Sequence, residues 1–100
     1  MDSVIRSFAN AATEDLFDGV DSRRARRVCP VHLWPAVRRK LTQLNRVGAL
    51  RELGVPPGNR LERLHGNRAG QHSIRVNEEY RLCSRWENGY ADEVEVTDYH

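Results

Sequence analysis

The sequence ends in three side chains that can exchange protons, Asp98, Tyr99 and His100. Just before them, residues 92–97 alternate valines with acidic or polar residues, a pattern typical of a β-strand with one buried face. Chain ends usually fray into solvent. Because a strand that pairs in a sheet holds its end in place, we expect these three residues to belong to a functional site at the end of the last strand.

Other side chains in the second half of the sequence could do chemistry together with that end. They are the acid–base groups Glu62 and His65 and the arginines Arg68, Arg75 and Arg81. Cleavage of RNA without a metal needs a base for the ribose 2′-OH proton, an acid for the leaving 5′-oxygen, and cations for the charge around phosphorus. The sequence has groups for each role, but many small basic domains contain the same residues, so composition alone is weak evidence.

Arginine dominates the basic residues: fifteen of the sixteen are arginine, and the exception is Lys40. Guanidinium groups bind phosphates in a bidentate manner and stack on bases. Residues 1–50 carry nine basic and five acidic side chains, against seven and nine in residues 51–100. This predicts a basic helical side that suits a polyanion such as RNA, although an arginine-rich proteome would give the same composition without that function.

The length and composition predict one globular domain over residues 1–100. The hydrophobic fraction is 39% and the charged fraction 30%, which is typical of a folded chain. A chain of this size removes roughly 60–68% of its unfolded surface from water, so it has little stability to spare for a deep cavity. We therefore expect a site in a surface groove and no cofactor.

The two cysteines, Cys29 and Cys83, have neither the C-x-x-C spacing nor the Cys/His pattern of a zinc site. We expect free, buried thiols and no metal. The sequence also lacks the apolar core of a signal peptide and any run approaching about 18 apolar residues. We therefore expect no membrane span and a cytoplasmic location.

The first half of the sequence predicts one strand and several helical segments. The main helix follows from apolar residues at three- and four-residue steps, with proline tolerated in its first turn. The caps follow from residue types that accept backbone hydrogen bonds or adopt positive φ. The segments are a strand over Val4–Phe8, a helix capped by Thr13 and ended by Gly19, a turn capped by Asp21 or Ser22, and a main helix over Trp34–Arg46.

The second half reads as strands. A breaker cluster at residues 55–59 ends the helical part. The connections between the strands after it have hairpin length, so the sheet should be largely antiparallel. Helices early and strands late predict an α+β fold with helices on one sheet face. The strands are expected over Arg60–Leu64, Gln71–Asn77, Tyr80–Trp86 and Ala91–Thr97.

Alternation along these strands separates an apolar face from a polar one. The helices should cover the apolar face, which carries Ile74, Leu82, Trp86, Val94 and Val96. The alternative to a functional polar face is a solvated one held by cross-strand ion pairs. The polar face is expected to carry Ser73, Arg75, Arg81, Cys83, Arg85, Glu93 and Glu95.

A longer motif joins several of these residues. It runs over Arg60–Asn77, continues with Tyr80-Arg81-Leu82 and Trp86-Glu87-Asn88-Gly89, and ends with Asp98-Tyr99-His100. In this arrangement the sequence resembles the HigB-type toxins of the RelE superfamily over essentially its whole length. The most specific parts are the pattern L(K/H)G(D/N)RxGxxSIR(V/I)N, the aromatic–arginine pair after it, and the DYH ending.

The resemblance implies a toxin of a type II toxin–antitoxin pair that enters the ribosomal A site and cleaves mRNA there. Its partners would be mRNA on the ribosome and a HigA-like helix-turn-helix antitoxin, with operator DNA bound only through the toxin–antitoxin complex. The implied fold is RelE-like α+β, with an N-terminal strand and helices on one face of a mostly antiparallel sheet completed by four C-terminal strands. That order agrees with the elements predicted above.

The resemblance also implies roles for individual residues. Arg81 matches the strand arginine that contacts the scissile phosphate, and Asp98, Tyr99 and His100 match the C-terminal active-site residues. In our assignment Arg68 assists Arg81 with phosphate charge, and His100 is the general acid. Tyr99 stacks on a base or relays a proton, and Asp98 orients its neighbours.

Two positions depart from the family pattern. Glu62 stands where some members have histidine, and His65 stands where lysine is more common. Glu62 can still act as a base, whereas His65 supplies a cation only when protonated. Arg75 is expected to bind phosphate. An α-carboxylate on His100 would favour its imidazolium form, which suits an acid.

Two other functions stay open at this point. One is a catalytically degenerate family member that only binds protein or nucleic acid. The other is a free-standing RNA-binding domain. That would need aromatic residues spread over the sheet for base stacking, and the face of Arg75, Arg81 and Arg85 is poor in them.

Overall fold

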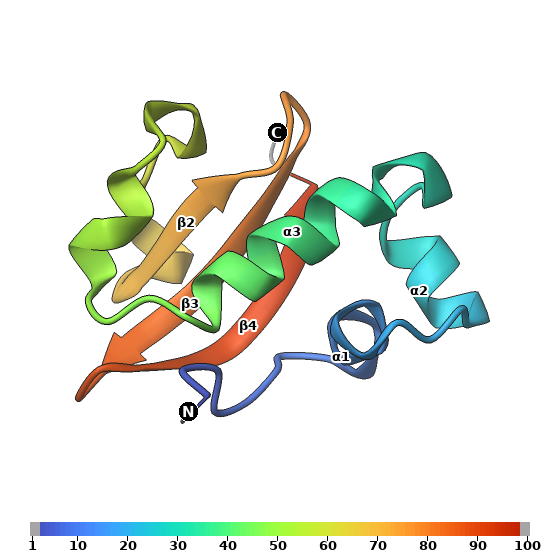
Figure 1. Ribbon diagram of the computed structural model, residues 1–100, viewed down its shortest axis with the longest axis horizontal. Coiled ribbons are helices and arrows are strands. Elements are labelled where there is room, and N and C mark those ends of the chain that lie inside the picture. Colours follow the sequence, from blue (N-terminus) through green and yellow to red (C-terminus); the bar gives the residue numbers. More distant parts are fainter. Residues whose placement is uncertain (1–2, 99–100) are drawn as a thin grey trace.

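The computed structural model describes residues 3–98 of the chain. In this part a helical layer packs on one face of a four-stranded antiparallel sheet of order β1-β2-β3-β4. Figure 1 shows α3 lying across that face, with α1 and α2 beyond the β4 edge. The elements are α1 (Ala11–Asp18), α2 (Arg23–Val28), α3 (Trp34–Leu44), β1 (Glu62–Arg63), β2 (Gln71–Arg75), β3 (Tyr80–Glu87) and β4 (Tyr90–Asp98).

Asn10 caps the N-terminus of α1, so the prediction of Thr13 as the cap was wrong. The Asn10 side chain accepts from the Thr13 backbone N–H at 2.8 Å, as an N-cap does. Thr13 is fully buried, and its hydroxyl donates to Asn10 and accepts from the backbone N–H of Val96 at 3.2 Å. Thr13 therefore joins α1 to β4. Gly19 ends the helix with φ of 76°, as expected.

The other helices follow the predicted pattern with shorter ends. Ser22 caps α2 by accepting from the Ala25 backbone N–H at 3.1 Å. The main helix α3 begins at Trp34 as predicted but ends at Leu44, before the expected Arg46. Four 3₁₀ turns lie among the described residues of the connections: Val31–Leu33 before α3, Leu50–Gly54 and Pro57–Asn59 before β1, and Gly66–Arg68 between β1 and β2.

The N-terminal segment predicted as a strand forms only isolated bridges within residues 3–98. Ile5 and Phe8 each bridge to β4 in parallel, opposite Ala91 and Val94. Continuous pairing fails between them because β4 bulges there. At the bulge the Glu93 backbone N–H bonds to the Ser7 side chain instead.

The bulge in β4 inserts one extra residue between β3 positions Cys83 and Arg85. Glu93 takes the extra position with φ of 54°, in the left-handed region. Because the strand shifts by one residue there, Ala91 and Val94 both reach the core and are fully buried, although they are three residues apart.

The core lies between α3 and the sheet. It is built from apolar side chains that are nearly inaccessible to solvent, including Leu16, Val37, Leu41, Leu44, Leu53, Ile74, Leu82, Val94 and Val96.

Both cysteines are free and buried, which confirms the prediction for the thiols. Burial raises the pKa of the Cys29 thiol to about 11. No helix in the described part of the chain is long and apolar enough to cross a membrane.

Candidate active site

The face of the sheet that the helices leave open carries a polar row across all four strands. Glu62 of β1 pairs with Ser73 of β2, Ser73 with Cys83 of β3, and Cys83 with Glu95 of β4. Residues in register on neighbouring strands point to the same face. In the next row Arg75 of β2 lies opposite Arg81 of β3. The predicted polar face is therefore present.

Arg81 lies at the centre of this face and is held in one orientation. It is only 7% exposed. Its Nε donates to the Ser73 hydroxyl at 2.8 Å, and its Nη2 donates to the Arg60 carbonyl oxygen at 2.7 Å. The Glu62 carboxylate lies 3.9 Å from the same Nη2. A buried guanidinium fixed by hydrogen bonds presents its charge without reorganisation, which suits the stabilisation of charge developing on phosphate.

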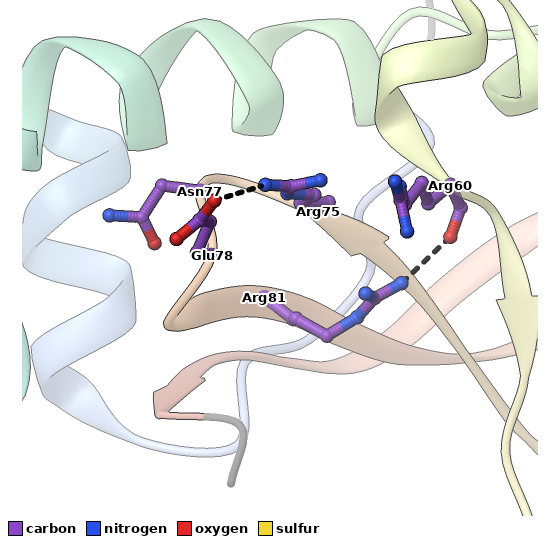
Figure 2. Close-up of a pocket in the computed structure, with 5 residues that line it drawn as sticks. All are labelled: Arg60, Arg75, Asn77, Glu78 and Arg81. Atoms are coloured by element: carbon purple, nitrogen blue, oxygen red, sulfur yellow. Dashed lines mark hydrogen bonds and ion pairs between the residues drawn. The ribbon is translucent and has the colours of Figure 1, made fainter.

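Arg81 also borders a hollow of about 310 Å³ in the molecular surface. Arg60, Arg75, Asn77 and Glu78 form the rest of its lining (Figure 2). Arg75 and Arg81 come from the two strands of one hairpin, and Arg60 comes from the segment before β1. The hollow thus opens beside a cluster of guanidinium groups.

Arg68 and Glu95 form the second ion pair of interest on this face, with Nη1 and Oε1 at 3.1 Å. Arg68 also donates to the Gln71 side chain at 3.0 Å. Cys83 lies between this pair and Arg81. Burial is the main reason that its thiol pKa is raised, and the nearby arginines oppose that effect. A protonated thiol here serves packing rather than nucleophilic attack.

The last residue of β4, Asp98, lies on the strand next to the one that carries Arg81. Asp98 is exposed and pairs with Tyr80, the residue next to Arg81. The pKa of the Tyr80 hydroxyl is raised, first by partial burial and then by the charge of Asp98. Tyr99 and His100 lie outside the described residues.

Apart from Asp98 and His65, the predicted site residues within 3–98 lie in two clusters on the open face of the sheet. The structure brings Glu62, Arg75 and Arg81 together, and it places Arg68 with Glu95 on the same face. His65 is exposed in the loop before the 3₁₀ turn Gly66–Arg68, to which it contributes its backbone carbonyl.

Sequence reasoning missed Arg60, Ser73 and Asn77 as parts of the site. The signal for Ser73 was available, since it lies two residues before Arg75 and so shares the polar face. Arg60 had none, because its place depends on a left-handed backbone conformation with φ of 44°. Among residues 3–98, no group of three or more His, Cys, Asp and Glu side chains is arranged to hold a metal ion.

The fold places the chain in a known structural class. It is similar to a chain of the YoeB–YefM complex from Staphylococcus aureus, with a TM-score of 0.54, 19% identity, and coverage of 96% of this chain and 97% of that one. At this identity the likeness concerns the fold alone. The shared fold is α+β, with a helical layer on the four-stranded antiparallel sheet of residues 3–98.

The family follows from the sequence comparisons. Residues 6–100 match the model for the HigB-like toxin, described as the RelE-like toxin of type II toxin–antitoxin system HigB. Toxin HigB-1 of Vibrio cholerae serotype O1 is 46% identical over 65 residues, which span 65% of this chain and 68% of that protein. An uncharacterised protein of Haemophilus influenzae is 36% identical over 65 residues, 65% of this chain and 64% of that protein. The chain belongs to the HigB-like family of toxins, which confirms the resemblance and implies an antitoxin as partner.

Proposed function

We propose that this toxin is a metal-independent endoribonuclease that cleaves mRNA in the ribosomal A site. The observation that carries the proposal is Arg81, a buried guanidinium held by Ser73 and Arg60, with Glu62 beside it on the open face of the sheet. Membership of the HigB-like family supports this assignment. The family match extends to residue 100, so it includes Asp98, Tyr99 and His100.

In the proposed reaction the ribose 2′-oxygen attacks phosphorus, so that a P–O2′ bond forms and the P–O5′ bond breaks. Glu62 takes the 2′-OH proton, and His100 gives a proton to the leaving 5′-oxygen. The products are a 2′,3′-cyclic phosphate and a 5′-hydroxyl, and no oxidant or further reactant is needed. Arg81 stabilises the extra negative charge on the phosphorane oxygens, with Arg68 and Arg75 adding to the positive field.

The remaining predicted residues have supporting roles in this proposal. Tyr99 stacks on a base or relays a proton, and Asp98 orients its neighbours at the end of β4. His65 contributes a cation when its imidazole is protonated. A HigA-like helix-turn-helix antitoxin holds the toxin inactive, and operator DNA is bound only through the toxin–antitoxin complex.

The test is cleavage of a defined mRNA by purified protein, with and without translating ribosomes. We expect cuts only with ribosomes. We expect Arg81→Ala to lower the rate roughly 10²- to 10³-fold, since it removes a preorganised donor to the developing charge. His100→Ala should lower it roughly 10²- to 10⁴-fold as the loss of a general acid.

Arg51→Ala is the matched control, because Arg51 is exposed in the 3₁₀ turn Leu50–Gly54. Its rate should equal that of the wild type. A folded wild-type protein that makes no cuts under either condition would overturn the proposal. Antitoxin binding without cleavage would then identify the chain as a degenerate member that acts as a binding module.

A further inference from the structure

Three arginines, Arg60, Arg75 and Arg81, line the hollow. Arg75 and Arg81 are direct cross-strand neighbours, and like charges in that position destabilise a sheet. Among the described residues, the carboxylates that approach these arginines are Glu78, 3.8 Å from Arg75, and Glu62, 3.9 Å from Arg81. Both distances exceed those of a good charge-assisted hydrogen bond, so neither glutamate forms a tight ion pair with its arginine.

The two glutamates also differ from the arginines in their exposure to solvent. The Glu78 side chain is 91% exposed and the Glu62 side chain 48%, and exposed ion pairs contribute little. The Arg75 side chain is 27% exposed, by contrast, and that of Arg81 is 8% exposed. The two glutamate side chains are therefore more exposed than those of Arg75 and Arg81.

The backbone before β1 adds Arg60 to this cluster. Arg60 has φ of 44° and ψ of 58°, which non-glycine residues seldom adopt. In this conformation its carbonyl oxygen accepts the hydrogen bond from Arg81, while its side chain lines the hollow (Figure 2). Arg60 therefore holds Arg81 through its backbone carbonyl and adds its own guanidinium to the lining of the hollow. Strained backbone conformations of this kind are common at functional sites.

We propose that Arg60 and Arg75 bind the RNA phosphate adjacent to the one that Arg81 contacts, so that the site holds two successive phosphodiesters. This inference rests on the proposed function for its ligand, single-stranded RNA. Asn77 lines the same hollow and can donate to a phosphate or a ribose oxygen. Two bound phosphates would fix the backbone on one side of the cleaved bond, which aligns the 2′-oxygen with phosphorus.

The test measures both binding and cleavage on ribosomes programmed with a defined mRNA. Binding uses mRNA with a 2′-O-methyl group at the cut, which cannot react, and cleavage uses unmodified mRNA. We expect Arg60→Gln and Arg75→Gln each to weaken binding about 10- to 100-fold, as for the loss of one charge-assisted hydrogen bond. Arg51→Gln, which removes a charge from an exposed turn outside the hollow, should bind as the wild type does.

A single uncharged methylphosphonate linkage identifies the phosphate. When the methylphosphonate replaces the phosphate on one particular side of the cut, wild-type binding should weaken about 10- to 100-fold. The same linkage should not weaken the binding of Arg60→Gln any further, because the variant and the linkage remove the same contact. Binding unaffected by either variant, or by the methylphosphonate on both sides of the cut, would overturn the inference. Binding that follows the expected pattern while wild type cuts no mRNA would leave the subsite standing and defeat the proposed activity instead.

Thermal unfolding separates this role from a structural one. Loss of one like-charged cross-strand neighbour should leave the unfolding midpoint of Arg75→Gln equal to or above that of the wild type. A variant that loses both binding and stability would show that Arg75 supports the fold, and the inference would fail for that residue.

Discussion

Neutral oxygen acceptors hold Arg81 in place at the site. The Ser73 hydroxyl and the Arg60 carbonyl each accept one of its hydrogen bonds, at 2.8 and 2.7 Å. These two acceptors fix the direction of the guanidinium group. Ser73 is 1% exposed and is not directed at solvent. We therefore assign it the part of a positioning residue for Arg81.

Ser73→Ala should lower the cleavage rate constant about tenfold with little change in KM. The substitution leaves the buried Nε of Arg81 without an acceptor, which costs roughly 1.5–3 kcal/mol for a charged donor. The arginine then loses its fixed orientation in the transition state. Single-turnover cleavage on ribosomes measures this effect per folded molecule.

The matched control for Ser73→Ala is Ser84→Ala, which removes a buried hydroxyl from the helix-covered face of the same sheet. Its rate constant should stay at the wild-type value. A rate constant unchanged in Ser73→Ala, with only the unfolding free energy lowered, would show that Ser73 has a purely structural part.

For a residue on a regular strand, the sequence predicts which face of the sheet its side chain occupies. Alternation places Arg75 and Arg81 on one face, and the register of the hairpin brings them opposite each other. Arg60 could not be found in this way. Its contribution comes from a left-handed conformation after the 3₁₀ turn Pro57–Asn59, and φ of that sign is unusual for an arginine.

The bulge in β4 shows the limit of periodicity at the scale of an element. Strict alternation puts Val94 and Val96 on one face but sends Ala91 to the other. The extra residue at Glu93 changes the count, so that Ala91 and Val94 are both fully buried. A bulge depends on pairing with β3 and on the N-terminal segment, and neither is encoded in the local pattern of β4.

Glu93→Val tests this bulge against the alternation. A regular strand would gain from valine, which has a high β-propensity. With φ of 54° at this position, a β-branched residue is strained instead, and we expect a loss of about 1–2 kcal/mol in unfolding free energy. Urea unfolding measures the difference.

Glu93→Asn is the control, because asparagine tolerates the left-handed region. Both variants lose the exposed ion pair with Arg85, so the difference between them isolates the backbone. A valine variant as stable as the asparagine variant would mean that position 93 is not left-handed in solution.

The first residue of a helix is also hard to predict from the local sequence. Thr13 and Asn10 are both good capping types, and the sequence does not say which one starts α1. The choice is made by tertiary structure, because Thr13 is needed as an acceptor for the backbone N–H of Val96. The interior of α3, from Trp34 to Leu44, was predicted correctly because its apolar spacing is set by the sheet it covers.

Over the whole molecule, buried apolar contacts join α3 to the sheet, while charged contacts tie the peripheral parts together. Asp15 of α1 accepts from Arg24 at 2.5 Å and from Ser22 at 2.6 Å, and so joins α1 to α2. Asp92 of β4 accepts from Arg6 at 2.9 Å and joins the N-terminal segment to the sheet. Since Arg24 and also Arg26 are paired with carboxylates, part of the basic cluster on α2 serves the fold.

These ties predict how the stability of the molecule depends on pH. Hydrogen bonds from Arg24 and Ser22 lower the pKa of Asp15 to about 2, and Arg6 is the main cause of a lowered pKa for Asp92. A carboxyl group with a lower pKa in the folded state stabilises it fully above the unfolded pKa, and that contribution disappears as the pH falls through the folded pKa. The thermal midpoint should therefore fall as the pH drops from roughly 4 to 2.

Replacing both carboxylates tests that assignment. Asp15→Asn combined with Asp92→Asn should lower the midpoint at pH 7 and flatten its dependence between pH 4 and pH 2, so that the two curves converge at low pH. Asp18→Asn, on the exposed side of the same helix α1, controls for the loss of a carboxylate in general. Parallel curves for the wild type and the double variant down to pH 2 would show that other groups govern acid unfolding, and that the peripheral elements are attached mainly by apolar contacts.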